Sequence, residues 1–167
     1  MAAPIWVVDT SALIQIKSSI PHGQRPHVFI ALTALVTEGR LMFPPQVLHE
    51  LERDSEGHAP DQVCSWALSV EATACALAAS YEEVKAVLAI VPDVLDSMKD
   101  PRVDEADPYV IALAGRLRLE GHDARVVVQE TRDSPRKLSL NTACGMLGIP
   151  SVPLLGLLRA EGISTGA

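Results

Sequence analysis

Four acidic residues that lie far apart in the chain could share one site in the folded protein: Asp9, Glu50, Asp107 and Glu130. Carboxylate oxygens are the hard ligands that Mg²⁺ and Mn²⁺ prefer, and one or two suffice when water and a substrate phosphate complete the shell. Two such ions about 3.5–4 Å apart can bind the attacking oxygen and the leaving oxygen when a phosphodiester is hydrolysed. These residue types therefore point to divalent-cation chemistry on phosphate esters.

Each of these acids also has an ordinary structural explanation. Asp9 and Asp107 stand where helices are expected to begin, and aspartate is a common helix cap. Glu50 could be a solvated residue near the edge of a buried helix face. Four close carboxylates without cations would raise one another's pKa, which two divalent ions would relieve. The local patterns leave both interpretations open.

The elements that must position these acids follow from short apolar runs. Runs rich in β-branched or aliphatic residues predict strands at 5–8, 41–43, 124–128 and 151–152. Helices are expected at 12–16, 28–38, 45–51, 62–79, 81–91, 108–119, 141–147 and 153–161. This alternation predicts a single α/β domain over 1–167, with a mostly parallel central sheet of about four to five strands flanked by helices. The two helices within 62–91 are expected to pack as a pair. Ligands in such sheets bind beyond the carboxyl ends of the strands.

The composition excludes several classes of protein. The 167 residues carry a formal net charge of −7 at pH 7, which argues against a protein that coats nucleic acid through a basic surface. The start lacks the pattern of a signal peptide, and no run approaches the roughly 18 apolar residues of a membrane span. We therefore expect a cytoplasmic protein with no membrane association and with free, buried thiols at Cys64, Cys75 and Cys144.

Other kinds of catalytic or nucleotide site lack their sequence signals. The five histidines show no zinc-binding spacing, and neither a dinucleotide-binding nor a P-loop glycine motif is present. Ser11 has no histidine near it in the sequence, which disfavours a serine nucleophile.

Four segments in order resemble the PIN-domain family of metal-dependent ribonucleases, which includes the VapC-type toxins. They are 7–14 with Asp9-Thr10-Ser11, 47–51 with Glu50, 106–114 with Asp107, and 126–130 with Glu130; the segment 154–158 adds to them. The resemblance spans nearly the whole chain. It implies a PIN-like three-layer fold and Mg²⁺- or Mn²⁺-dependent hydrolysis of RNA phosphodiester bonds.

The resemblance also implies roles for individual residues. Asp9, Glu50 and Asp107 match the first three acidic positions of the family, as catalytic residues and metal ligands. Thr10 and Ser11 would place hydroxyls beside these ligands. A metal held there would lower the pKa of a bound water for attack on the phosphodiester.

The fourth acidic position departs from the common pattern. The family usually has Thr-x-Asp after this strand, whereas this chain has Val128-Gln129-Glu130. Glu130 then takes the place of the fourth catalytic and metal-binding acid, and Val128 replaces the threonine. Asp133 is the alternative fourth acid. The stretch 130–148 is similar to a PIN subgroup with a longer loop before a helix containing Asn and Cys.

The resemblance implies two partners: an RNA substrate and an antitoxin protein of a type II toxin–antitoxin pair. The basic loop residues Arg132, Arg136 and Lys137 could contact RNA phosphates or form a solvated loop. Dimerisation could use 28–38 or 62–91. Two alternatives stay open: a catalytically inactive PIN-fold binding or scaffolding module, and a housekeeping nuclease without an antitoxin.

Overall fold

The computed structural model describes residues 2–130 and 132–166 and has one four-stranded sheet in which every strand is parallel. The strands are β1 (Ile5–Val8), β2 (Leu41–Met42), β3 (Ala124–Val127) and β4 (Ser151–Val152), in the spatial order β2-β1-β3-β4. In the central pair, Val8 is in register with Val127. The predicted α/β class with a parallel sheet is confirmed, with four strands.

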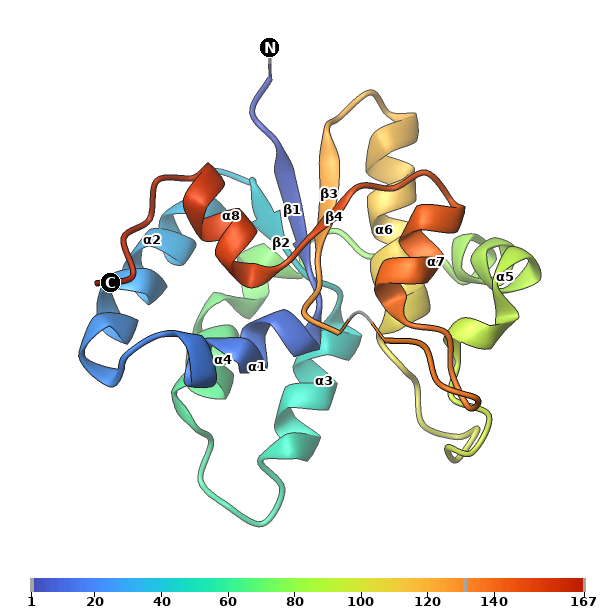
Figure 1. The fold of residues 1–167 in the computed structure, drawn as a ribbon, viewed down its shortest axis with the longest axis horizontal. Helices are drawn as coiled ribbons and strands as arrows, with labels where there is room; N and C mark the ends of the chain where they lie inside the picture. The colour runs from blue at the N-terminus through green and yellow to red at the C-terminus, as the bar shows by residue number, and fades with distance from the viewer. Residues whose placement is uncertain (1, 131, 167) are drawn as a thin grey trace.

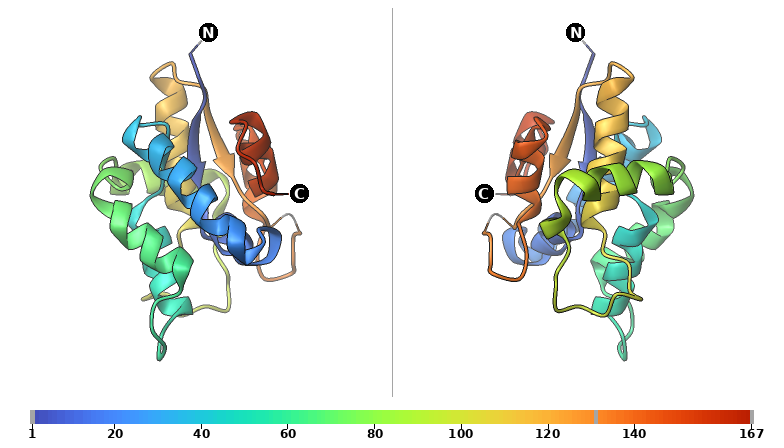
Figure 2. Two further views of the ribbon diagram at one scale, coloured as in Figure 1. Left: turned by 90° about the vertical axis from the view of Figure 1, so that its left-hand side faces the viewer. Right: turned by 90° about the vertical axis from the view of Figure 1, so that its right-hand side faces the viewer.

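Eight α-helices flank the sheet within the described residues. They are α1 (Thr10–Ser19), α2 (Arg25–Thr37), α3 (Pro45–Asp54), α4 (Gln62–Ala74), α5 (Tyr81–Ile90), α6 (Asp107–Leu119), α7 (Leu140–Met146) and α8 (Leu154–Ala160). Two short 3₁₀ turns, His22–Gln24 and Pro92–Val94, precede α2 and follow α5. Figure 2 shows α7 and α8 on one side of the sheet and α4, α5 and α6 on the other. This arrangement is consistent with the expected PIN-like three-layer fold (Figure 1).

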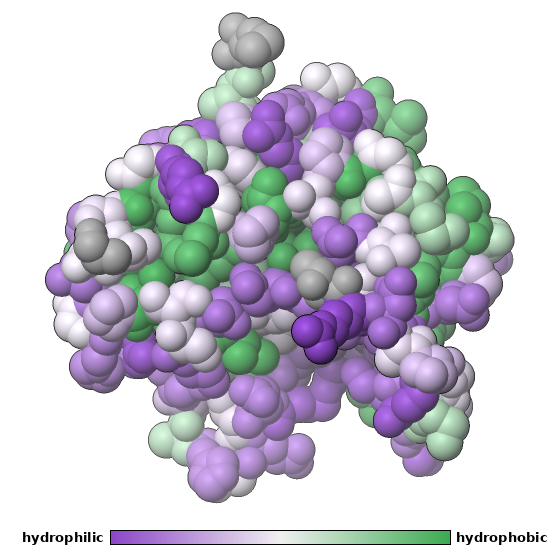
Figure 3. Space-filling model, in the orientation of Figure 1, coloured by the Kyte–Doolittle hydropathy of each residue, from purple (hydrophilic) through white to green (hydrophobic). Residues whose placement is uncertain are grey.

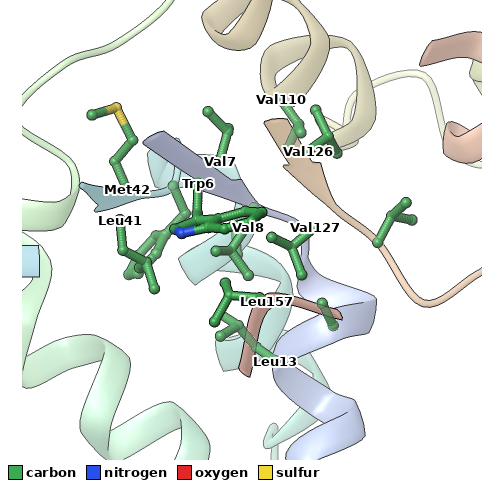
Figure 4. Packing of buried hydrophobic residues seen from close by; sticks show 14 of the residues in the cluster. Trp6, Val7, Val8, Leu13, Leu41, Met42, Val110, Val126, Val127 and Leu157 are labelled. Atoms are coloured by element: carbon green, nitrogen blue, oxygen red, sulfur yellow. The ribbon is translucent and has the colours of Figure 1, made fainter. Parts of the chain in front are cut away.

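The core forms around β1 because this strand is covered on both faces. Trp6, Val7 and Val8 are at most 1% exposed. Leu13 from α1 and Leu157 from α8 lie beside Val8 (Figure 4). A continuous apolar run is therefore the stable sequence for this strand, and the first polar residue after it falls at the edge of the sheet.

The helical region after β2 differs from the prediction. α4 ends at Ala74 rather than at residue 79, and Ser80 then starts α5 through a capping box with Glu83. The two helices do not pack as a pair: α4 packs against α2 and α3, whereas α5 packs against α6 (Figure 1). The Ala-rich sequence of this region predicted the two helices but not the helices they pack against.

Within the described residues, no helix combines the length and the apolarity that crossing a bilayer requires. All three cysteines are free; Cys64 and Cys144 are buried, whereas Cys75 is partly exposed.

Candidate active site

The parallel sheet brings the acidic residues toward its carboxyl edge. Asp9 immediately follows β1, and Glu130 lies three residues after the end of β3. α6 begins with Asp107 at this edge, and α3 contributes Glu50 beside α1. In Figure 1 these elements meet below the lower ends of the strands. The surface in the same orientation is hollowed along its lower edge between two protruding, mostly hydrophilic segments (Figure 3).

Asp9 is a buried acid with one satisfied and one unsatisfied oxygen. Its side chain is 4% exposed. Oδ2 accepts hydrogen bonds from the backbone N–H of Ser11 at 3.2 Å and from the Ser11 hydroxyl at 2.7 Å. Oδ1 has no hydrogen-bond partner within the described part of the chain. Burial and the negative charge of Asp107 together raise the pKa of Asp9 to about 7.

The hydroxyls of Thr10 and Ser11 lie beside these acids and hydrogen-bond to them. The Thr10 hydroxyl donates a 2.6 Å hydrogen bond to Oε1 of Glu50, which joins α1 to α3. The Ser11 hydroxyl accepts a 3.0 Å hydrogen bond from the backbone N–H of Gln129. Burial raises the pKa of Glu50, and so does the charge of Asp107, while the Thr10 bond opposes the shift. Asp9, Glu50 and Asp107 thus form one electrostatic group.

Lys137 reaches into this group from the loop after β3. Its Nζ lies 2.7 Å from Oδ2 of Asp107 and 4.0 Å from Oε2 of Glu130. Burial would lower the pKa of Lys137, but the charges of Asp107, Glu130 and Asp9 outweigh burial and raise it. An ammonium group of this chain therefore neutralises part of the acidic group.

The other basic residues of the loop lie in different environments. The guanidinium of Arg136 binds both carboxylate oxygens of Asp96, at 3.1 and 2.9 Å. Arg132 is exposed. The alternative fourth acid, Asp133, accepts a 2.9 Å hydrogen bond from the backbone N–H of Ser139, which holds the start of α7 and lowers the pKa of Asp133. Of the two candidates for the fourth acid, Glu130 is the one that lies beside Lys137.

The donor set suits a divalent cation that needs few protein ligands. No three His, Cys, Asp or Glu side chains of the described residues form a group that could hold a metal ion, so a closed site of the zinc type is not formed there. Mg²⁺ requires only one or two carboxylates when water and phosphate supply the remaining oxygens. Asp9 and Asp107 meet that requirement, and the unpartnered Oδ1 of Asp9 is the acceptor such an ion would satisfy. The full set of four carboxylate ligands stays a prediction.

Gln46 is a neighbour of this site that sequence reasoning missed. It lies one helical turn before Glu50 in α3, on the same face of the helix. Its Oε1 is buried and has no hydrogen-bond partner among the described residues. The i, i+4 spacing to Glu50 was the available signal. Gln46 therefore offers a second unsatisfied oxygen on the helix that carries Glu50.

Cys144 in α7 was expected to be a buried thiol, and the structure places it near the acids. Burial raises its pKa to about 12, and the charges of Asp107 and Asp9 add to that shift. A thiol with so high a pKa stays protonated at neutral pH and is a poor nucleophile.

Together, the fold and these residues define an α/β protein with buried carboxylates at the carboxyl edge of a parallel sheet. A family model described as "Domain of unknown function (DUF4411)" matches residues 6–165. The chain belongs to this family. No curated protein and no solved structure matches the chain.

Proposed function

We propose that this protein is a Mg²⁺- or Mn²⁺-dependent endoribonuclease whose centre is built around Asp9 and Asp107. One observation carries the proposal: Oδ1 of Asp9 is buried and unpartnered among the described residues, beside a second buried acid. A buried polar atom without a partner is costly and is uncommon away from functional sites. A buried carboxylate such as Asp9, whose pKa is raised by burial and by a neighbouring acid, is a frequent feature of such sites.

The chain's own residues have distinct roles in this proposal. Asp9 and Asp107 hold the cation, and Ser11 fixes the carboxylate of Asp9 through its two hydrogen bonds. Thr10 fixes one oxygen of Glu50, and the raised pKa of Glu50 suits this residue to hold a proton beside the scissile phosphate. When bound, Mg²⁺ or Mn²⁺ supplies Lewis-acid stabilisation of phosphate charge and activates water.

The choice of RNA as substrate is supported by the resemblance to PIN-domain ribonucleases and by the basic loop. Arg132 is exposed on the loop that follows β3 and could bind a phosphate. The toxin role and its antitoxin partner are supported by the resemblance alone and stay predictions. A homodimer through the helices of 28–38 or 62–91 also stays a prediction. A cytoplasmic location belongs to the same proposal and is supported by the three free cysteines.

The test is cleavage of a mixed set of structured RNAs with Mg²⁺ or Mn²⁺, comparing the wild type with Asp9→Asn and with an EDTA control. Metal-dependent cleavage that is lost in Asp9→Asn supports the proposal. If neither protein cleaves, a calorimetric titration with Mn²⁺ separates two outcomes. Binding that depends on Asp9 supports a nuclease with a narrow choice of RNA, whereas no binding contradicts the metal centre.

A catalytically inactive binding module is the second candidate, and one observation favours it. Lys137 already supplies a positive charge to Asp107 at 2.7 Å. A cleft that has lost its metal could be kept stable by such an internal ion pair. Absence of both cleavage and Mn²⁺ binding would favour this candidate.

A further inference from the structure

Lys137 is a charged side chain that is mostly buried. It is 18% exposed, and Asp107, its closest partner, is 8% exposed. Its second acidic neighbour, Glu130, is half exposed, with 4.0 Å between the charged atoms. An ammonium group in such a place is stable only when a carboxylate pairs with it closely, and Asp107 provides that contact.

The backbone of the loop holds this lysine in place. Ser134 and Lys137 exchange two backbone hydrogen bonds of 2.9 and 3.2 Å, which close a tight turn. Arg136, the neighbouring residue, is anchored to Asp96 on the loop that follows α5. The backbone N–H of Ser97 also donates a 3.2 Å hydrogen bond to the carbonyl of Arg136. The turn and its anchor direct the Lys137 side chain toward the acids.

The two acids differ in their charged neighbours as a result. Oδ1 of Asp9 and Oδ2 of Asp107 are both buried and accept no hydrogen bond within the described residues, but only Oδ2 of Asp107 has an ammonium group 2.7 Å away. A divalent cation that binds both carboxylates must share Asp107 with a fixed positive charge. Two cations that compete for one carboxylate oppose each other's binding, since like charges at this distance repel.

We infer that Lys137 is a tethered counter-ion that occupies Asp107 in the metal-free protein and is displaced when a divalent cation binds, so that this lysine sets the cation affinity of the site. The inference rests on the proposed cation site and adds its regulation. The ammonium of Lys137 and the divalent cation compete for the carboxylate of Asp107, so each weakens the binding of the other. Such coupling between two binding events typically changes an affinity about 5- to 150-fold. Removal of the ammonium group therefore tightens divalent-cation binding within that range.

The test is a calorimetric titration of the full chain with MnCl₂ alone, comparing wild type with Lys137→Gln. We expect Lys137→Gln to bind Mn²⁺ about tenfold more tightly, and Lys137→Arg, which keeps the charge, to remain close to the wild type. The matched control is Lys85→Gln. Lys85 is exposed on α5 and pairs with Glu82 at 3.8 Å, so its removal leaves the Mn²⁺ affinity unchanged.

A second measurement needs no variant and covers the case in which Lys137→Gln fails to fold. Lysine acetylation of the wild-type protein by an N-hydroxysuccinimide ester, followed by mass spectrometry, reports how accessible each amine is. We expect Lys137 to react slowly without a divalent cation and several-fold faster with Mn²⁺. Lys85 should react equally under both conditions.

The outcomes separate this inference from the proposed function. Equal or weaker Mn²⁺ affinity in Lys137→Gln, with binding still lost in Asp9→Asn, overturns the counter-ion role and leaves the cation site in place. Unchanged acetylation of Lys137 on Mn²⁺ binding likewise overturns displacement. No Mn²⁺ binding by either protein overturns the cation site and this inference together. Metal binding without cleavage of the mixed RNAs bears on the choice of RNA and leaves the counter-ion role in place.

Discussion

The hydroxyl of Ser11 connects the ends of the two central strands. It accepts a 3.0 Å hydrogen bond from the backbone N–H of Gln129, just after β3, and donates a 2.7 Å hydrogen bond to Oδ2 of Asp9, just after β1. One small side chain thereby fixes the orientation of Asp9 and the path of the chain toward Glu130. Two of the predicted acids depend on this contact for their positions.

Replacement of Ser11 by alanine should destabilise the protein and weaken the site. Ser11→Ala removes both side-chain hydrogen bonds and leaves the N–H of Gln129 without its partner, a loss of about 1–3 kcal/mol in the free energy of unfolding. Urea denaturation measures this loss. The matched control is Ser18→Ala on the exposed side of the same helix, which should change stability by less than about 0.5 kcal/mol. Equal effects at both positions would contradict the role given to Ser11.

The pH dependence of stability should follow the buried carboxylate of Asp9. Its pKa is about 7 in the folded chain against an ordinary value of 3.8, so between these values the native state holds a proton that the unfolded state has lost. Stability therefore decreases as pH rises from about 4 to about 7, by an amount on the order of a few kcal/mol. Glu50, whose pKa is also raised, contributes in the same direction.

Asp9→Asn isolates this contribution. With EDTA present, we expect the variant to lose much of the decrease in unfolding free energy between pH 5 and pH 8, and to be more stable than the wild type at pH 8. Added Mn²⁺ should stabilise the wild type more at pH 8 than at pH 6, because only ionised carboxylates bind the ion. Denaturant titrations at these pH values measure both effects. Identical pH profiles for the two proteins would show that Asp9 is ionised throughout.

Glu161 provides a prediction about the fold away from the site. Its side chain is 12% exposed, pairs with Arg40, and accepts a 2.8 Å hydrogen bond from the indole N–H of Trp6. Glu161→Ala leaves the indole N–H of Trp6 without an acceptor and removes one of the two carboxylates paired with Arg40, which should cost about 2–3 kcal/mol. Glu161→Gln keeps an acceptor for the indole and should cost less. Thermal unfolding of both variants measures the two losses. Equal losses in Glu161→Gln and Glu161→Ala would mean that Glu161 acts only through its charge, and would contradict this prediction.

The strands and the positions of Asp9 and Glu130 could be predicted from sequence because a buried parallel strand is a short apolar run that ends at a polar residue. Thr10 and Ser11 were predictable as neighbours of these acids, since they are adjacent in the chain. The pairing of Lys137 with Asp107 was not, because a twelve-residue loop separates β3 from the next helix and loop paths depend on tertiary contacts such as Arg136 with Asp96. The same reason explains the wrong partner assigned to α4.

Arg132 and Arg136 were predicted together as RNA-binding residues, and the structure distinguishes them. Arg136 is already engaged by Asp96 through two hydrogen bonds, whereas Arg132 is exposed and makes no ion pair within the described residues.

In an Asp9→Asn background, which prevents cleavage, Arg132→Gln should weaken binding of a labelled single-stranded RNA and reduce the slope of log affinity against log salt by about 0.7, the value for one lost phosphate contact. Arg136→Gln should have the smaller effect because its charge is already paired. Fluorescence anisotropy over a range of salt concentrations measures both slopes. A larger loss from Arg136→Gln would mean that RNA binding opens the pair with Asp96, and that the loop which carries Lys137 moves when substrate binds.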